Sequence, residues 1–251
     1  MSDHVLHLGD CLDPVTGLAS LPDKSVDHVI CDPPYEAEAH TSQRRVNASG
    51  TGGKVKTAPV DFAAITEDER DICGNAIGRL VARWALVFCQ VEATEAWRAS
   101  ACPPLVYKRT CAFVKQGTPQ FTGDRPGMGY ESFVCMHPEG RSEWNGGGRD
   151  GVFDVPRDLV NRDGGRNVHP TQKPLALMLE LVSLFTDPGD LILDPFAGSG
   201  TTGVAALRLG RRCILIEKDP KYAAMCVERM RAEEAGSTLA ASRAGQEALF
   251  R

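Results

Sequence analysis

The residues best suited to act on a flat, amine-bearing ring occur together at Asp32-Pro33-Pro34-Tyr35. They follow the apolar run Val26–Cys31, which predicts a buried strand that ends where the prolines begin. A carboxylate accepts hydrogen bonds from an amine, the prolines cannot continue a strand or helix, and an aromatic ring can stack on a planar substrate. The pattern therefore predicts a rigid pocket for a planar amine at the end of a strand.

A second group of residues has the composition of a ligand-binding loop. The run Leu191–Leu193 precedes Asp194, and Gly198-Ser199-Gly200 follows just before a helical stretch. Glycines allow a ligand to approach the backbone closely, and a helix N-terminus offers unpaired N–H groups to an anion. A tight turn that only caps the helix is the simpler alternative.

The acids around this loop indicate what it binds. Glu217 ends the next apolar run about 20 residues after Asp194, where an acid can accept hydrogen bonds from ribose hydroxyls. The Gly-x-Gly-x-x-Gly fingerprint of a dinucleotide site fits only in part, and Asp194 would repel a pyrophosphate. The same carboxylate suits an ammonium group. A nucleoside with an amino-acid tail is therefore favoured over a dinucleotide.

Alternating strands and helices are expected to position these two groups of residues. Such an alternation predicts a mostly parallel sheet with helices on both faces, and hence an α/β fold. Strands are predicted at 5–8, 26–31, 85–89, 105–114, 131–136, 151–155, 191–193 and 213–216. Helices are predicted at about 14–21, 66–81, 93–101, 174–185 and 201–209, and from 219 onward.

The composition is that of an ordinary globular domain. The chain has 251 residues, of which 42% are hydrophobic and 24% charged. No apolar stretch approaches the roughly 20 residues of a membrane span, and the N-terminus lacks signal-peptide features, so a cytoplasmic, nucleoid-associated protein is expected. Nine cysteines without a Cys-x-x-Cys pair and six scattered histidines favour neither a disulfide framework nor a metal site.

The distribution of charge is more informative than the net charge of −5. Residues 39–60 and 105–123 each contain basic side chains and no acid, although a solvated face is an equally good interpretation of either segment. An acidic protein with local basic loops can still bind DNA with salt-sensitive affinity. The candidate DNA-binding residues are Arg44, Arg45, Lys54, Lys56, Lys115 and Arg125.

The two groups, together with His169-Pro170-Thr171-Gln172-Lys173-Pro174, resemble the motifs of the S-adenosylmethionine-dependent amino-methyltransferases of DNA. The order of the catalytic tetrapeptide before the cofactor loop is similar to the β group of that family. The resemblance implies a Rossmann-like methyltransferase fold with a mostly parallel, seven-stranded sheet and one antiparallel strand at Tyr130–Val134. It implies a single circularly permuted domain over 1–233 and a tail over 234–251. Within the domain we expect a mobile loop at 36–60 and a small target-recognition region within 115–168.

The family's functional residues carry over by motif. Asp32, Pro33, Pro34 and Tyr35 would form the catalytic pocket, in which Asp32 and the Pro33 carbonyl accept the two amine hydrogens and Tyr35 stacks on the base. The methionine end of the cofactor would lie near Asp194, Thr171 and Lys173. Glu217 would bind its ribose and Asp10 its adenine. The full set of expected cofactor contacts is Asp10, Cys11, Asp32, Thr171, Lys173, Asp194, Phe196, Ala197, Gly198, Ser199, Gly200, Thr201, Thr202, Glu217 and Lys218.

These roles imply an enzyme that moves a methyl group from S-adenosylmethionine to the N6 amine of a flipped-out adenine in DNA, leaving S-adenosylhomocysteine. In the β group, Asp at the first position of the tetrapeptide accompanies adenine targets. An RNA adenine or a DNA cytosine-N4 methyltransferase is the first alternative. The second is a non-catalytic, cofactor-binding regulatory module. No metal or membrane partner is expected, and a homodimer is left open.

Overall fold

An eight-stranded sheet forms the centre of the protein, in a computed structural model that describes residues 4–35, 45–47, 54–56, 64–115, 126, 129–155, 172–237 and 239–243. The strand order is β1-β10-β9-β2-β5-β7-β6-β8. Only β7 runs against its neighbours, since it pairs antiparallel with both β5 and β6 while every other pair in this sheet is parallel. The strands are β1 His4–Leu8, β2 His28–Cys31, β5 Ala85–Cys89, β6 Leu105–Lys115, β7 Tyr130–Pro138, β8 Val152–Val155, β9 Leu191–Asp194 and β10 Arg212–Glu217.

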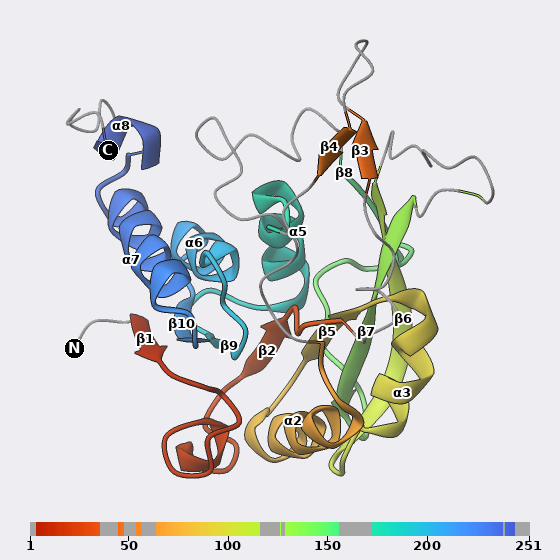
Figure 1. Cartoon of the computed structure of the whole chain (residues 1–251). Helices are drawn as coiled ribbons and strands as arrows, with labels where there is room; N and C mark the ends of the chain where they lie inside the picture. The colour runs from red at the N-terminus through yellow and green to blue at the C-terminus, as the bar shows by residue number, and fades with distance from the viewer. Residues whose placement is uncertain are drawn as a thin grey trace.

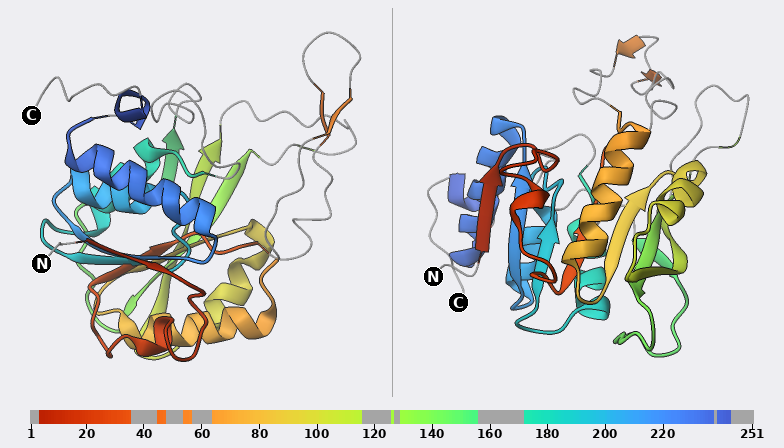
Figure 2. Two further views of the ribbon diagram at one scale, coloured as in Figure 1. Left: turned by 60° about the vertical axis from the view of Figure 1, so that its left-hand side comes forward. Right: turned by 90° about the horizontal axis from the view of Figure 1, so that it is seen from below.

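Helices cover both faces of this sheet. Figure 1 shows α5 and α6 together on one side and α2 on the other, and Figure 2 places α2 and α7 on opposite sides of the twisted strands. The helical elements are η1 Leu18–Ser20, α2 Glu67–Leu80, η2 Val91–Ala93, α3 Thr94–Ala99, α5 Leu175–Phe185, α6 Thr201–Arg208, α7 Pro220–Glu234 and α8 Leu239–Arg243.

The central strand β5 shows how one sequence serves two apolar layers. Leu86 and Phe88 belong to the cluster under α5, α6 and α7, whereas Ala85, Val87 and Cys89 belong to the cluster under α2 and α3. All five residues are buried, because successive side chains of a strand point to opposite faces and both faces are covered here. The expected α/β, Rossmann-like class, with a mostly parallel sheet and one antiparallel strand, is confirmed.

The local signals for most elements are also confirmed. Helix α2 begins at a complete capping box, in which Thr66 Oγ1 accepts from the Glu69 amide at 3.3 Å and the Glu69 carboxylate accepts from the Thr66 amide at 2.8 Å. Helix α7 begins at Pro220 after an Asp219 cap. Each cap satisfies amides that the first helical turn leaves without a partner.

Two expectations about the elements were wrong. The sheet has eight strands rather than seven, because the short run Val152–Val155 also pairs with β6. The segment 14–21 forms only the short 3-10 helix η1, because Asp13 Oδ1 binds the amides of Val15 and Thr16 at 2.9 and 2.7 Å. Such local side-chain bonds compete with helical ones.

The stretch 36–60, expected to be a mobile loop, lies mostly outside the described residues. Within it, β3 Arg45–Asn47 and β4 Lys54–Lys56 form a separate, two-stranded antiparallel sheet. Nearly half of the proposed target-recognition region within 115–168 is likewise outside the described residues, which here are 115, 126 and 129–155. The proposed domain limits stay predictions.

Candidate active site

Four neighbouring parallel strands end at one edge of the sheet, and an acidic residue lies at or just after each end. Asp194 and Glu217 are the last residues of β9 and β10, Asp32 follows β2, and Asp10 lies two residues after β1. Because β1, β10, β9 and β2 are adjacent and parallel, these residues lie on the same side of the molecule. The carboxyl edge of such a sheet is where open α/β folds bind ligands.

The Asp32 carboxylate uses one oxygen within the protein and leaves the other for a ligand. Its Oδ2 lies 2.5 Å from Lys173 Nζ. Its Oδ1 is buried and has no hydrogen-bond partner among the residues that the structure describes. A buried acceptor without a partner is costly, so this oxygen is available for a donor that the substrate brings. An amine is such a donor.

Tyr35 lies beside the same lysine, Lys173, as Asp32 does. Its backbone carbonyl accepts from the Ile65 amide at 3.3 Å, which ties the tetrapeptide to the residues before α2. Burial raises the pKa of the Tyr35 phenol well above its usual value, although Lys173 opposes this shift. The side chain is therefore a neutral aromatic surface at physiological pH, as base stacking requires.

Lys173 is the centre of a cluster of charges that the sequence did not reveal. Its Nζ lies 3.4 Å from the Tyr35 hydroxyl, 3.1 Å from Glu131 Oε2 and 4.9 Å from the centre of the Phe88 ring. Burial has the largest single effect and would lower the pKa of Lys173, but Asp32 and Tyr35 together outweigh it and the pKa is raised. Lys173 is thus a permanent cation inside the site.

Glu131, at the start of β7, joins this cluster from the other side. Its Oε1 forms an ion pair with Lys115, the last residue of β6, and its Oε2 faces Lys173. The Oε2 contact is electrostatic, since no hydrogen bond from the described residues reaches that oxygen in a favourable direction. From the sequence, Glu131 was predicted only as part of a strand. One signal could have identified Glu131. It lies near the start of the antiparallel strand, and such a strand begins at the edge where the parallel strands end.

The glycine loop has the backbone of a ligand cradle. Gly198 and Gly200 adopt φ values of +53° and +80°, which residues with a Cβ rarely adopt. The Glu217 carboxylate accepts from the Gly198 amide at 2.7 Å and from the Asp219 amide at 2.8 Å. Glu217 therefore fixes the loop against the next strand.

Asp194 lies under this loop in an unfavourable environment for a charge. It is only 3% exposed, and its Oδ1 accepts from the Phe196 amide at 3.0 Å. Burial raises its pKa to about 7, against the hydrogen bonds from Thr202 and Phe196, and Asp32 and Glu217 add repulsion. A ligand that brings a positive charge would relieve this burial cost.

Arg229 of α7 supports the loop from behind, and the sequence motifs do not mark it. Its Nη1 donates to Ser199 O at 2.7 Å and to Ser199 Oγ and Thr201 Oγ1 at 3.0 Å each. Burial lowers the pKa of Arg229 to about 10, so it stays charged at neutral pH. An Arg in the middle of a helix gave no local signal, because only the packing of α7 against α6 brings it to the loop.

Of the remaining predicted cofactor residues, those that the structure describes follow the same strand ends. Asp10 is exposed and accepts from the Leu12 amide at 2.9 Å, while Cys11 is buried and belongs, with Ile65, to the apolar cluster against which Phe196 packs. Ala197 is buried and Lys218 exposed. Thr171 lies outside the described residues, as does His169. The functional roles of all these residues stay predictions.

The candidate DNA-binding residues are placed only in part. Arg44 and Arg125 lie outside the described residues, and of Arg45, Lys54 and Lys56 only the backbone is described. Lys115 lies at the active-site edge, paired with Glu131. No helix in the described part of the chain has the length and apolar character needed to cross a membrane. The same residues contain no cluster of three or more His, Cys, Asp or Glu side chains suited to a metal ion.

The fold is similar to those of solved DNA methyltransferases of the Rossmann-like class. The fold matches the crystal structure of the M1.HpyAVI–SAM complex with a TM-score of 0.67 at 21% identity, over 90% of this chain and 98% of that one. It also matches the PvuII DNA methyltransferase, named as cytosine-N4-specific, with a TM-score of 0.66 at 15% identity, over 90% and 86% of the two chains.

The sequence comparisons find DNA methyltransferases over parts of the chain. Residues 105–228 match the model of the N6/N4 methyltransferases, described as DNA methylase. The DNA adenine methyltransferase YhdJ of Escherichia coli (strain K12) is 46% identical over 79 residues, which are 32% of this chain and about a quarter (26%) of that protein. Residues 105–228 are therefore similar to the N6/N4 DNA methylase family.

Proposed function

We propose that this protein transfers a methyl group from S-adenosylmethionine to the N6 amine of an adenine in DNA. The observation that carries the proposal is the Asp32 carboxylate, which presents a buried Oδ1, unpartnered among the described residues, beside Tyr35 at the carboxyl edge of the sheet. The family match and the adenine-specific name of the Escherichia coli relative support the choice of reaction.

The residues of the glycine loop fit such a cofactor. Gly198 has open space on the side where a Cβ would lie, the buried Asp194 would gain from an ammonium group, and Glu217 places a carboxylate at the next strand end. S-adenosylmethionine supplies an activated methyl group on a sulfonium. The protein's contribution is to hold the acceptor amine beside that methyl group.

The amine of adenine is a poor nucleophile, because its lone pair is delocalised into the ring. Asp32 Oδ1 and the Pro33 carbonyl would accept hydrogen bonds from the two N–H groups of this amine. The nitrogen would then rehybridise, and its lone pair would become available for attack. Tyr35 would stack on the base, a contact worth about 1–3 kcal/mol. Since a base inside a duplex cannot reach this pocket, the target would be flipped out of the helix.

The first alternative is a different acceptor, because the N6/N4 family also contains cytosine-N4 enzymes and a tetrapeptide cannot distinguish DNA from RNA. Purified protein would be incubated with labelled S-adenosylmethionine and either DNA or RNA, and the digested nucleosides identified. Detection of N6-methyldeoxyadenosine supports the proposal. N4-methyldeoxycytidine or a methylated ribonucleoside would replace it with the corresponding alternative.

The second alternative is a cofactor-binding protein without catalysis. It predicts saturable binding of S-adenosylmethionine and no labelled nucleoside in either nucleic acid. Sequencing of DNA from a host that expresses the chain, with detection of modified bases, would add the methylated position and its sequence context.

A further inference from the structure

We propose that Lys173 and Glu131 are positioning residues for Asp32, so that Lys173 acts through this carboxylate rather than on the cofactor. The proposal rests on the function proposed above. The family motif assigns Lys173 to the methionine end of the cofactor, whereas its ammonium group lies among the oxygens of Asp32, Tyr35 and Glu131.

The Asp32 carboxylate needs such a partner. The last torsion of an aspartate side chain has a broad energy minimum, so an unrestrained carboxylate presents its oxygens in many directions. Lys173 holds Oδ2 at 2.5 Å and thereby leaves Oδ1 as the oxygen that faces an incoming amine. One oxygen is used for positioning and the other remains for the substrate.

Lys173 is itself held firmly. Its side chain is only 10% exposed, and its ammonium group lies over the Phe88 ring of β5. Pro174 follows it and caps α5, which fixes the backbone at this point. The Lys173 side chain would lose buried contacts in any other rotamer. Its ammonium group therefore has a fixed position, which in turn fixes the position of the Asp32 carboxylate.

Glu131 gives this arrangement its second anchor. Its side chain is 13% exposed and lies between Lys173 and Lys115, at the point where β6 and β7 pair. The four side chains Lys115, Glu131, Lys173 and Asp32 alternate in charge and balance one another. A buried cation without a second carboxylate would carry a larger desolvation cost, so Glu131 keeps Lys173 in place between two acids.

The alternative is a direct contact between Lys173 and the carboxylate of the cofactor, which requires a different position of the ammonium group. It would require the ammonium group to leave Asp32 when the cofactor binds, and Oδ2 would then lose its partner. The two roles therefore predict different positions of Nζ in a complex with cofactor, and different effects of Lys173 on binding and on the chemical step.

The first test measures both quantities on the full-length protein. Lys173→Met should lower the single-turnover rate of methyl transfer to DNA by about 100-fold, because a small misplacement of a reacting group costs this much. Its dissociation constant for S-adenosylhomocysteine, measured by calorimetry, should stay that of the wild type. Glu131→Gln should lower the rate by a smaller factor, again without weakening cofactor binding. Lys173→Arg should recover part of the rate.

Matched controls exist at the opposite end of the same strands. Lys108→Met on β6 and Glu139→Gln just after β7 change the same residue types outside the site and should leave both quantities unchanged. A Lys173→Met protein that binds the cofactor weakly but transfers methyl groups at the normal rate once saturated would overturn the proposal.

The second test does not depend on activity. In a crystal structure of the wild-type protein with S-adenosylhomocysteine, Lys173 Nζ should remain within hydrogen-bond distance of Asp32, and in Lys173→Met the Asp32 carboxylate should lose its single orientation. Movement of Nζ to the cofactor carboxylate would overturn the positioning role. A wild-type protein that shows the expected geometry but methylates no nucleic acid would contradict only the proposed function.

Discussion

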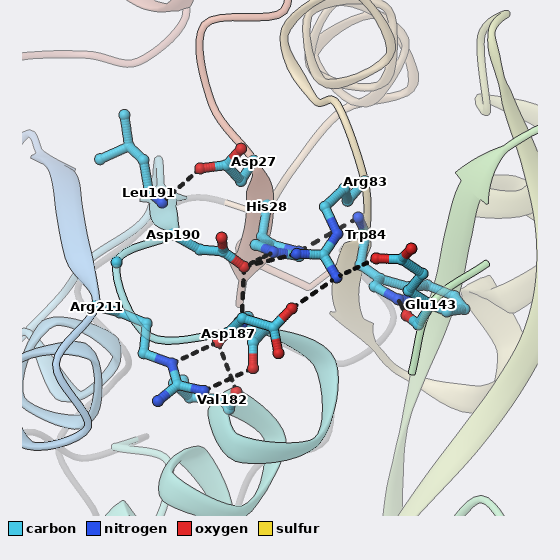
Figure 3. A network of polar contacts seen from close by, with 12 residues as sticks. Asp27, His28, Arg83, Trp84, Glu143, Val182, Asp187, Asp190, Leu191 and Arg211 are labelled. Atoms are coloured by element: carbon cyan, nitrogen blue, oxygen red, sulfur yellow. Dashed lines mark hydrogen bonds and ion pairs between the residues drawn. The ribbon is translucent and has the colours of Figure 1, made fainter. Parts of the chain in front are cut away.

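The His28 ring nitrogen Nε2 lies 2.8 Å from Asp190 Oδ2, across a sequence separation of 162 residues. The other ring nitrogen accepts from the Trp84 amide at 3.4 Å, so the imidazole is neutral and donates from Nε2. Arg83 binds the same Asp190 oxygen at 2.8 Å. Figure 3 shows these side chains in a polar network. Since His28 begins β2 and Asp190 directly precedes β9, the network lies at the edge of the sheet opposite the active site. The network joins β2, β9 and the start of β5.

This network predicts a pH dependence of stability. Burial lowers the pKa of His28 below its usual value of about 6.5, although Asp190 opposes the shift. Protonation therefore favours the unfolded chain, and the stability that neutral His28 contributes is complete above about pH 6.5 and lost as the pH falls below it. The free energy of unfolding, measured with urea, should decrease from pH 7 to pH 5.

His28→Asn is the variant that tests this dependence. It should be less stable at pH 7 by about 1–3 kcal/mol, because buried partners are left unsatisfied, and its stability should change less between pH 7 and pH 5. His7→Asn, at an exposed position of β1, is the control and should keep the wild-type slope. An unchanged slope in His28→Asn would assign the dependence to another group.

Removal of the catalytic carboxylate should separate chemistry from binding. Asp32→Ala deletes the acceptor for the target amine and should abolish methyl transfer, while the dissociation constant for S-adenosylhomocysteine stays near that of the wild type. Asp23→Ala, an exposed acid that pairs with Arg79 far from the site, should retain full activity. Methyl transfer by the Asp32→Ala variant would contradict the proposed mechanism.

Asp194 should make cofactor binding pH-dependent. Its pKa, raised to about 7 by burial, means that the carboxylate is charged above this pH and protonated below it. If it pairs with the ammonium group of the ligand, the affinity for S-adenosylhomocysteine should rise from pH 6 to pH 8. Asp194→Asn should bind more weakly at pH 8 and lose the rise centred near pH 7. Equal pH profiles of wild type and variant would remove Asp194 from the binding site.

Arg229 should stabilise the glycine loop. Arg229→Met leaves Ser199 O and two hydroxyl groups without their buried donor, at a cost of about 1–3 kcal/mol in the free energy of unfolding. Affinity for S-adenosylhomocysteine should fall with it, since the loop loses its support. Arg231→Met, an exposed position on the same helix, controls for the loss of charge. Wild-type affinity in Arg229→Met would show that the loop does not need this support.

Gly200 is required for two separate reasons, which a pair of variants distinguishes. A Cβ at Gly200 would meet Cys226 Sγ at 2.4 Å and would also have to adopt φ +80°. Gly189, at φ +89°, has open space where a Cβ would lie, so Gly189→Ala costs only the backbone strain of about 1–2 kcal/mol. Gly200→Ala should lose more than this in thermal stability, and should also bind S-adenosylhomocysteine more weakly. Equal losses of thermal stability in Gly200→Ala and Gly189→Ala would mean that Cys226 on α7 moves aside for the added methyl group.

The amino-acid sequence by itself determined the elements and the two motif loops. Apolar runs such as Ala85–Cys89 are short and continuous, which is sufficient to predict buried strands. The capping box at Thr66 and the Asp219 cap mark helix starts, because they satisfy amides within a few residues, and Pro220 has no amide hydrogen to satisfy. Where such local bonds competed with a helix, as at Asp13, the prediction was wrong.

The tertiary structure alone decided which of these elements are neighbours. The order β1-β10-β9-β2-β5-β7-β6-β8 places Lys173 against Asp32, Glu131 against Lys173, and Asp190 against His28. These pairs join positions far apart in the chain, and ionic contacts carry no periodicity that local sequence could display. Their partners follow from strand order and register, which the burial of the whole core selects. The sequence therefore placed Asp32 at a strand end, and the fold determined what holds it there.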